Sequence, residues 1–548
     1  MKFFSLALLL IVLSRNANSQ EVTNLYKDPG ELHGNVQIDA QYYNKDTVIK
    51  TPVVPEHMRM NAFANLIYTR GPISAGLRFE SYLNPLQGFD PRYQGNGIPF
   101  KYLNYKQKVF EITAGSFYEQ FGSGVLLRSY EERSLGYDNA FDGVRIKYNL
   151  FDALTIKGLV AKQRFFFSTG PGIVRAFDSE LLINNLLQQW KEKDLRISLG
   201  GSFVSKYQMD DNSTYKLPEN VGAGSGRVNL NYKGFAFNSE YAYKINDPTP
   251  INSFIYQKGE ALIIQSSYSQ KGLGISVTAK RIDNMGFRSD RTANLNNLMI
   301  NYIPATTRQH SYNLLATLYP YASQPTGEMA LQTELVYTFK KGTAIGGEYG
   351  TTVLINLSAV NSLDTLQIYD SLGYRGYKSD FFKAGKNEYF KEANIEISKK
   401  INKKLKLIAT YSNILYNMSV VQGLVGKGTI YANVEVLEIN YKLNGKNAIK
   451  CELQALQTKQ DKGDWVTGLV EYSIAPHWFF AVMDQYNIGN PINSEKVHYP
   501  IGSVGYLHET HRIQLTYGRQ RAGIFCIGGV CRAVPASNGL TITITSSF

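Results

Sequence analysis

Segments in which apolar and polar residues alternate recur along most of the chain. Residues 144–150 read Val-Arg-Ile-Lys-Tyr-Asn-Leu. The same alternation occurs at residues 227–232, 393–398, 449–455 and 466–472. Because successive side chains of a β-strand point to opposite faces, each segment predicts a strand with one apolar and one polar face. An apolar face toward lipid and a polar face toward a lumen are typical of membrane β-barrels. The ionisable residues expected to face the lumen include Arg145, Lys147, Lys450 and Glu452.

The connections between these segments alternate between short turns and longer polar loops. The short turns are expected at 69–72, 106–108, 151–153, 233–234, 270–272, 340–342 and 444–446. The longer loops are expected at 44–58, 84–97, 120–141, 207–220, 245–259, 284–293 and 360–389. Outer-membrane barrels show this asymmetry, with tight periplasmic turns and longer extracellular loops. A soluble sandwich has no reason to keep it along the whole chain.

The sequence therefore predicts an all-β protein, a single large antiparallel transmembrane β-barrel over residues 34–548. We expect about 26 strands, an even number that places both ends of the chain on one side of the membrane. The least regular candidate strands lie near 179–190 and 295–304, so 24 strands are also possible.

One predicted strand changes its phase of alternation part-way along. Its apolar positions are first Ile430, Ala432, Val434 and Val436, and then Leu437, Ile439, Tyr441 and Leu443. An extra residue inserted in one strand of an antiparallel pair would shift the phase in this way. The pattern predicts a β-bulge between Val436 and Leu437.

Both ends of the chain carry features of export and membrane insertion. Residues 1–19 predict a signal peptide, with Lys2, an apolar run and a small-residue cleavage site. Residues 20–33 then form a short periplasmic segment, too short for the folded plug domain of a TonB-dependent transporter. The last strand resembles the C-terminal signal read by the barrel-assembly machinery, and its expected members are Leu540, Ile542, Ile544 and Phe548. These features predict a location in the bacterial cell outer membrane.

Composition agrees with a barrel and narrows the set of partners. The 38 tyrosines and 28 phenylalanines fit the aromatic girdles found at both interfaces of a barrel. The formal net charge of +13 offers cations to lipopolysaccharide phosphates, although solvated loop and lumen charges are the simpler and favoured explanation. No basic cluster with a recognisable binding motif occurs, so no nucleic-acid partner is expected. Outer-membrane lipids, lipopolysaccharide and a protein of the cell envelope remain as expected partners.

Two of the three cysteines flank a predicted hairpin loop near the end of the chain. Cys526 and Cys531 are separated by Ile-Gly-Gly-Val, which would place them opposite each other on antiparallel strands. That spacing accepts a disulfide, and the periplasm is oxidising. We expect a disulfide there, and a reduced Cys451 facing lipid.

The densest charged stretch of the chain falls in one predicted loop. Its candidate functional residues are Arg128, Glu131, Glu132, Arg133, Asp138 and Asp142. Such a set either fixes the loop by ion pairs or forms a polar binding site. A wide barrel without a separate plug needs loops to fill its lumen, and the loops at 120–141 and 360–389 are the best candidates to fold inward. The second is rich in aromatic residues and suits a lid or a partner-docking surface.

The residues around this loop also carry a resemblance. The runs 115–124, 128–133 and 142–144 resemble an uncharacterised, porin-like family of Bacteroidota outer-membrane β-barrels. The segment 526–535 and the final Phe548 are similar to the ending of that family. The resemblance covers the whole mature chain and implies a barrel in the outer membrane. The family has no assigned activity, so the resemblance transfers no functional residue.

No arrangement of residues predicts catalysis, a cofactor or a metal site. The one close histidine pair, His508 and His511, falls in a predicted periplasmic turn and lacks the helical spacing of a zinc site. The sequence therefore predicts a non-enzymatic barrel, either for porin-like solute passage or as a structural partner subunit of an envelope complex. The alternative is a lipid or peptide hydrolase built on the same barrel.

Overall fold

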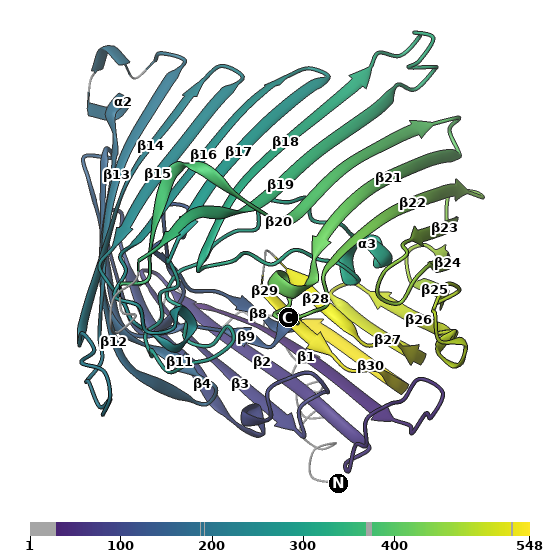
Figure 1. Ribbon diagram of the computed structural model, residues 1–548, viewed down its shortest axis with the longest axis horizontal. Coiled ribbons are helices and arrows are strands. Elements are labelled where there is room, and N and C mark those ends of the chain that lie inside the picture. Colours follow the sequence, from purple (N-terminus) through teal and green to yellow (C-terminus); the bar gives the residue numbers. More distant parts are fainter. Residues whose placement is uncertain (1–28, 187, 191, 369–374, 528–529) are drawn as a thin grey trace.

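The computed structural model describes residues 29–186, 188–190, 192–368, 375–527 and 530–548. Within them, 24 antiparallel strands form one sheet that closes on itself (Figure 1). The closure pairs β1 (Glu31–Tyr43) with β30 (Ser537–Ser547), with Asn35 opposite Ser547. The predicted fold class, a single large antiparallel barrel, is confirmed, with the smaller of the two expected strand numbers.

The barrel strands follow one another in chain order. Between β1 and β30 they are β2 (Met58–Arg70), β3 (Ile73–Leu83), β4 (Gly95–Lys106), β5 (Phe110–Phe117), β10 (Phe141–Leu150), β11 (Leu154–Phe165), β12 (Ser168–Leu182), β13 (Leu195–Tyr207), β14 (Asn220–Tyr232), β15 (Phe235–Lys244), β16 (Gly259–Gln270), β17 (Leu273–Asp283), β18 (Gly327–Phe339), β19 (Thr351–Gln367), β20 (Tyr377–Lys400), β21 (Leu405–Asn417), β22 (Thr429–Lys442), β23 (Asn447–Gln457), β24 (Trp465–Ile474), β25 (Trp478–Tyr486), β26 (Ile501–His508) and β27 (His511–Gln520).

Smaller elements occupy the connections. They are the strands β6 (Gln120–Phe121), β7 (Leu127–Arg128), β8 (Glu131–Glu132), β9 (Tyr137–Asp138), β28 (Gly523–Ile527) and β29 (Val530–Val534), the helices α2 (Ile183–Leu186), α3 (Asn313–Thr317) and α4 (Met418–Val421), and short 3-10 turns at Pro91–Tyr93, Arg133–Leu135, Gln188–Trp190, Pro250–Asn252 and Asn493–Glu495. No helix in the described ranges has the length and apolar character needed to cross a membrane.

Two expected strands are absent from the barrel sheet, which explains the count. The expected strand near 179–190 is the end of β12 followed by α2. The segment 295–304 belongs to the long connection between β17 and β18, where an isolated bridge joins Arg288 to Met299. Neither segment adds a strand to the sheet, because the chain leaves the wall of the barrel after Leu182 and throughout 295–304.

The outer face of the barrel is apolar, as the alternation predicts. Val144, Ile146 and Tyr148 of β10 point outward and are exposed, whereas the intervening Arg145 points inward and donates to Thr113 Oγ1 at 3.0 Å. A closed sheet leaves no unpaired backbone edge, and this exterior matches the hydrocarbon layer. The protein is therefore an outer-membrane barrel.

The phase change in β22 has a different cause from the predicted bulge. Its pairing with β21 and with β23 runs without a register shift, so the predicted bulge is wrong. Ile430, Val434 and Val436 point into the lumen and are buried, whereas Leu437 points outward and is exposed. The strand therefore keeps its phase along its whole length. The apolar positions change from the inward to the outward face because the lumen is apolar near the long loops and polar near the short turns.

The predicted inward loop at 360–389 is also wrong. β19 continues to Gln367 and β20 begins at Tyr377, so most of that segment is a long hairpin. Register shifts between Val360 and Thr365 bend the hairpin, and the bent part of β20 lies across neighbouring strands (Figure 1). Tyr377 Oη donates to Asp283 Oδ1 of β17 at 2.6 Å.

The backbone register of the β28–β29 hairpin places Cys526 opposite Cys531. The side chains of residues 525–531 lie outside the described ones, so the disulfide stays a prediction. Alkylation of the unreduced, unfolded protein should label Cys451 alone, since a disulfide leaves no thiol at the other two positions. Substitution Cys526→Ser should then make Cys531 reactive. Labelling of all three cysteines in the unsubstituted protein would contradict the disulfide.

Candidate functional site: the lumen and its inward loops

Two connections fold into the lumen and pack against the inner wall. The first joins β5 to β10 and carries Val125, Leu126 and Leu127, all fully buried. The second joins β17 to β18, and its Met285, Phe287 and Ile300 belong to the same apolar cluster. The wall contributes Leu159, Val174, Val204, Ala223, Ala242 and Ile263. Burial of these apolar surfaces holds both loops inside the barrel.

The second connection also covers the opposite wall. Its Leu314, Leu315 and Tyr319 form a separate buried cluster with residues of β18 to β24. Those wall residues include Val360, Ile414, Tyr416, Ile430, Val434 and Trp465. In both clusters the wall residues lie toward the strand ends that are joined by the long loops, which we call the loop side of the barrel. The two inward loops therefore fill the loop-side half of the lumen.

A buried ion cluster ties the first inward loop to the wall, and we call it the latch cluster (Arg78, Glu80, Glu131, Asp138 and Arg164). Arg164 lies 2.6 Å from both Glu80 and Asp138, and Arg78 lies 2.6 Å from Glu80 and 2.9 Å from Glu131. Arg78 also pairs with Asp138. Apart from Glu131, the side chains are at most 7% exposed. Charges this deeply buried are tolerated because each one is paired.

Buried lysines hold the second inward loop. Lys280 of β17 lies 2.5 Å from Glu328 and donates to the carbonyl of Pro304. Lys206 pairs with Asp247 at 2.8 Å beside the ring of Phe287. Within the loop, burial lowers the pKa of the Arg288 guanidinium to about 10. Arg288 therefore stays charged at neutral pH and donates to two loop carbonyls, those of Ala293 and Leu295.

The structure brings three of the six predicted loop residues together and places the other three apart. Glu131 and Asp138 join the latch cluster, and Arg133 bonds Glu131 at 2.7 Å. Arg128 stacks on the rings of Tyr130 and Tyr302, while Glu132 accepts from Ser134 Oγ at 2.6 Å. Asp142 is exposed on β10. Sequence reasoning missed the wall partners Arg78, Glu80 and Arg164, because nothing local indicates which lumen-facing charges a distant loop will meet.

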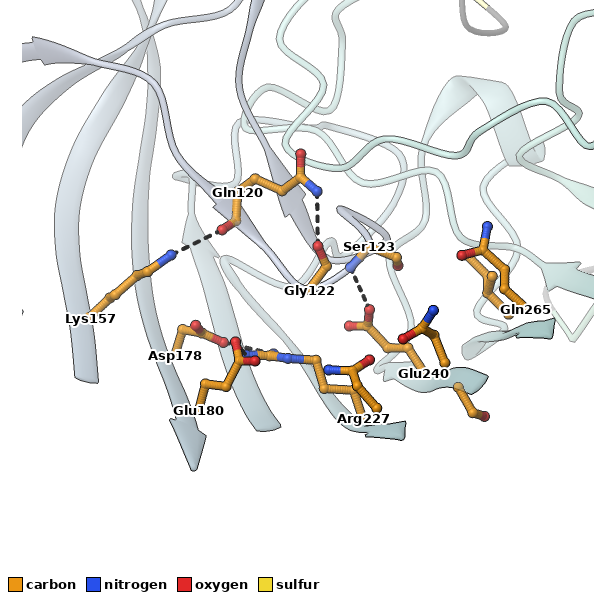
Figure 2. A pocket seen from close by; sticks show the side chains of 13 residues that line it. Gln120, Gly122, Ser123, Lys157, Asp178, Glu180, Arg227, Glu240 and Gln265 are labelled. Atoms are coloured by element: carbon orange, nitrogen blue, oxygen red, sulfur yellow. Dashed lines mark hydrogen bonds and ion pairs between the residues drawn. The ribbon is translucent and has the colours of Figure 1, made fainter. Parts of the chain in front are cut away.

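A polar pocket of about 430 Å³ lies in the lumen under the tip of the first inward loop (Figure 2). Its lining comes from the loop and from β11, β12 and β14 to β16. The lining includes Gln120, Gly122, Ser123, Lys157, Asp178, Glu180, Arg227, Asn229, Asn238, Glu240 and Gln265. Carboxylates, cations and amides therefore converge on one space large enough for a small solute.

The loop tip rests on one carboxylate of the pocket wall. Ser123 N–H donates to Glu240 Oε2 at 2.7 Å, and Ser225 Oγ donates to the other oxygen at 2.7 Å. Gly122 has a φ of +50°, and a Cβ there would lie 2.5 Å from Glu240 Oε2. Glycine is thus needed at this turn both for the backbone conformation and for the close approach.

The other pocket charges are paired. Arg227 lies 2.8 Å from Asp178 and 3.5 Å from Glu180, and Lys157 lies 2.8 Å from Glu119. Three lining carboxylates face two lining cations, which leaves a small negative excess. Among the described residues, no group of three or more His, Cys, Asp or Glu side chains is placed to hold a metal ion. The pocket suits reversible binding of a small polar solute by hydrogen bonds.

The remaining predicted residues lie away from the pocket. His508 and His511 flank the β26–β27 turn; the ring of His508 lies beside His477, and His511 Nδ1 bonds Ser546 Oγ at 2.7 Å. Leu540, Ile542 and Ile544 lie on one face of β30. The ring of Phe548 packs on Gly34 of β1. Their role as an insertion signal stays a prediction.

The family model "Family of unknown function (DUF6029)" matches residues 1–548. The chain belongs to the DUF6029 family. No curated protein matches the sequence. The comparisons do not test the Bacteroidota origin, which stays a prediction.

Solved structures show barrels of similar kind. The siderophore receptor PirA from Pseudomonas aeruginosa is 12% identical, with a TM-score of 0.39, over 95% of this chain and 81% of that one. The ferric enterobactin receptor PfeA from P. aeruginosa, solved with BCV-L6, gives 9% identity and a TM-score of 0.42 over 95% and 82%. OccK1 (OpdK) from P. aeruginosa is 8% identical, with a TM-score of 0.33, over 94% of this chain and 98% of that one. These scores are too low to carry a functional argument.

Proposed function

We propose that this DUF6029 protein passes a small polar solute across the outer membrane. Passage runs through a lumen whose loop-side half is filled by the chain's own connections. The observation that carries the proposal is the polar pocket directly under the Gly122–Ser123 tip, in contact with Glu240. A structural subunit has no need for a charged cavity of this size in its lumen, whereas a transport barrel needs a polar path through the lumen.

The arrangement resembles a gate built from internal loops. The first inward loop touches the pocket through Glu240 and the wall through the latch cluster, so solute binding and loop position share residues. A solute that competes for Glu240 removes one of the bonds that hold the loop tip. We expect the loop to move on binding, with the barrel wall unchanged.

Flux measurements on the purified protein test the proposal. Proteoliposomes should swell in small neutral polar solutes and swell less as solute size increases, and planar bilayers should show ion steps. Solute passage would be contradicted if neither swelling nor ion steps were seen, both for the intact protein and for a variant with a shortened second inward loop. Co-purification of a stoichiometric envelope protein would then favour the structural role.

Substitution Glu240→Gln should weaken the preference of the pore for cations. It removes one of three carboxylates in a pocket that holds two cations, so the negative excess disappears while the side-chain volume is kept. The reversal potential under a salt gradient should move toward the nonselective value. Glu334→Gln on β18, outside the pocket lining, serves as the matched control, and an equal shift in both variants would contradict the assignment.

A further inference from the structure

The bent tip of the β19–β20 hairpin lies on the outer wall of the barrel. We call its described residues, 362–368 and 375–386, the flap. The flap crosses in front of β15 to β17 in Figure 1. The wall residues under it, Leu262 and Arg281, alternate with the inward-facing Ile263 and Ile282 of the buried lumen cluster. They therefore point away from the lumen, toward the membrane.

Specific contacts fix the flap in this position. Tyr377 Oη donates to Asp283 Oδ1 at 2.6 Å, and Arg281 Nη2 donates to Ser379 Oγ at 2.6 Å. The ring of Phe381 covers the Arg281 guanidinium, with 4.6 Å between guanidinium carbon and ring centroid. A hairpin held this way is a built part of the surface, not a free loop.

Between the flap and the wall lies an apolar groove of about 360 Å³. Its lining includes Leu262, Ile264, Leu331, Phe381 and Phe382. Phe382 is 86% exposed at its rim. In water such a groove would be costly, so its natural occupant is apolar.

The groove lies at the loop-side end of the apolar band. Along β16 and β17, the outward-facing Glu260 and Asp283 lie at the loop-side strand ends, and Tyr268 and Ile275 lie near the short turn. Leu262 and Arg281 form the next outward-facing pair along these strands, closer to the membrane centre than Glu260 and Asp283. On a barrel with periplasmic short turns, this is the level at which outer-leaflet head groups meet acyl chains.

Cations accompany the apolar groove. Lys383 pairs with Asp364 at 2.7 Å and Lys391 pairs with Glu388. The exposed Lys378, Asp380 and Lys386 make no ion pair among the described residues, so the unpaired charges of the flap include two cations and one carboxylate. The Arg281 side chain is 3% exposed, with Glu260 at 3.6 Å and Asp283 at 2.9 Å. Its Nε has no hydrogen-bond acceptor among the described residues.

We propose that the flap clamps one phosphorylated lipid of the outer leaflet, of the lipopolysaccharide class. An acyl chain lies in the groove against Leu262 and Leu331, and a phosphate group meets Lys378 and Lys386. Charge-assisted bonds from lysine suit phosphate, and the apolar groove suits the chain. The site lies on the outer wall and is independent of any passage through the lumen.

Lipid retention by the purified full-length protein tests this site. Native mass spectrometry after addition of lipid A in detergent should show one lipid per barrel. The double substitution Lys378→Ala and Lys386→Ala should weaken binding roughly thirty-fold, given two cations facing an anionic head group. The matched control is Lys340→Ala with Lys341→Ala, two exposed lysines in the connection between β18 and β19, on the opposite edge of the barrel.

Four further outcomes decide the proposal. Phe382→Ser should also lower retention, and lipid A lacking its phosphates should bind the unsubstituted protein as weakly as phosphorylated lipid A binds the double variant. Equal retention by the unsubstituted protein, the double variant and Phe382→Ser would overturn the site. Loss of a dimer or trimer in the flap variants, without any change in lipid retention, would also overturn it and assign the groove to a second copy of the chain.

Discussion

Replacing residues 286–324 with a short glycine-serine linker is expected to give a wide, permanently open pore. The replaced segment supplies Phe287, Ile300, Leu314 and Leu315, which fill both sides of the loop-side lumen. A barrel of 24 strands is wide enough to leave an aqueous channel beside the first inward loop once the second is removed. We expect single-channel conductance at least roughly tenfold above that of the intact protein.

The barrel should survive this change, because the stem of the connection stays intact. Asn284 N–H donates to the carbonyl of Thr326 at 3.0 Å, and Met285 N–H donates to that of Pro325 at 2.9 Å. Since β17 and β18 are neighbours, a short linker joins them without strain. Wall residues such as Ile414 and Tyr416 become wet, which costs stability but leaves the backbone ladder complete.

The matched control shortens an exposed loop on the same edge of the barrel. Residues 423–427, between β21 and β22, include the exposed Leu424 and Val425 and project from the wall. Their removal should leave conductance unchanged. Equal conductance in the intact protein and in both variants would show that the second inward loop does not obstruct the lumen.

The sequence predicted the barrel because strand alternation is a local property. Each alternating segment, such as Val144 to Leu150, by itself predicts a strand with one apolar and one polar face. The alternation of short turns and long loops then indicates which strand ends face the periplasm. The same rule failed at Val436, where an apolar residue faces the lumen because a loop packs on it. Small wall residues such as Ala223 and Ala242 gave no signal of that packing, since alanine is common on either face.

The pocket could be predicted only in part. The charged residues between Arg128 and Asp142 identified a loop that either is fixed by ion pairs or forms a polar site. Its decisive partner, Glu240, lies on β15, and only the closed sheet brings the two together. The flap was missed for a related reason: a segment rich in aromatic and charged residues suggested a loop, and its register along β19 emerges only from pairing.

Substitution Asp138→Asn should release the first inward loop. Asp138 pairs with both Arg78 and Arg164, so an amide of the same size leaves two buried guanidinium groups short of one negative charge. Removing one partner from a buried ion cluster costs about 3–5 kcal/mol. We expect this cost to make the loop detach from the wall more often, while the barrel stays closed.

Limited trypsin digestion of proteoliposomes measures the release. Cleavage after Arg128 and Arg133 should be slow in the intact protein, where Leu126 and Leu127 beside them are fully buried, and fast in Asp138→Asn. Asp142→Asn makes the same chemical change four residues away on an exposed side chain, and it should keep the slow rate. The variant should also pass larger solutes than the intact protein, because its loop tip no longer rests on Glu240. Equal protection in all three proteins would mean that apolar packing alone holds the loop, and the latch cluster would then have no part in the gate.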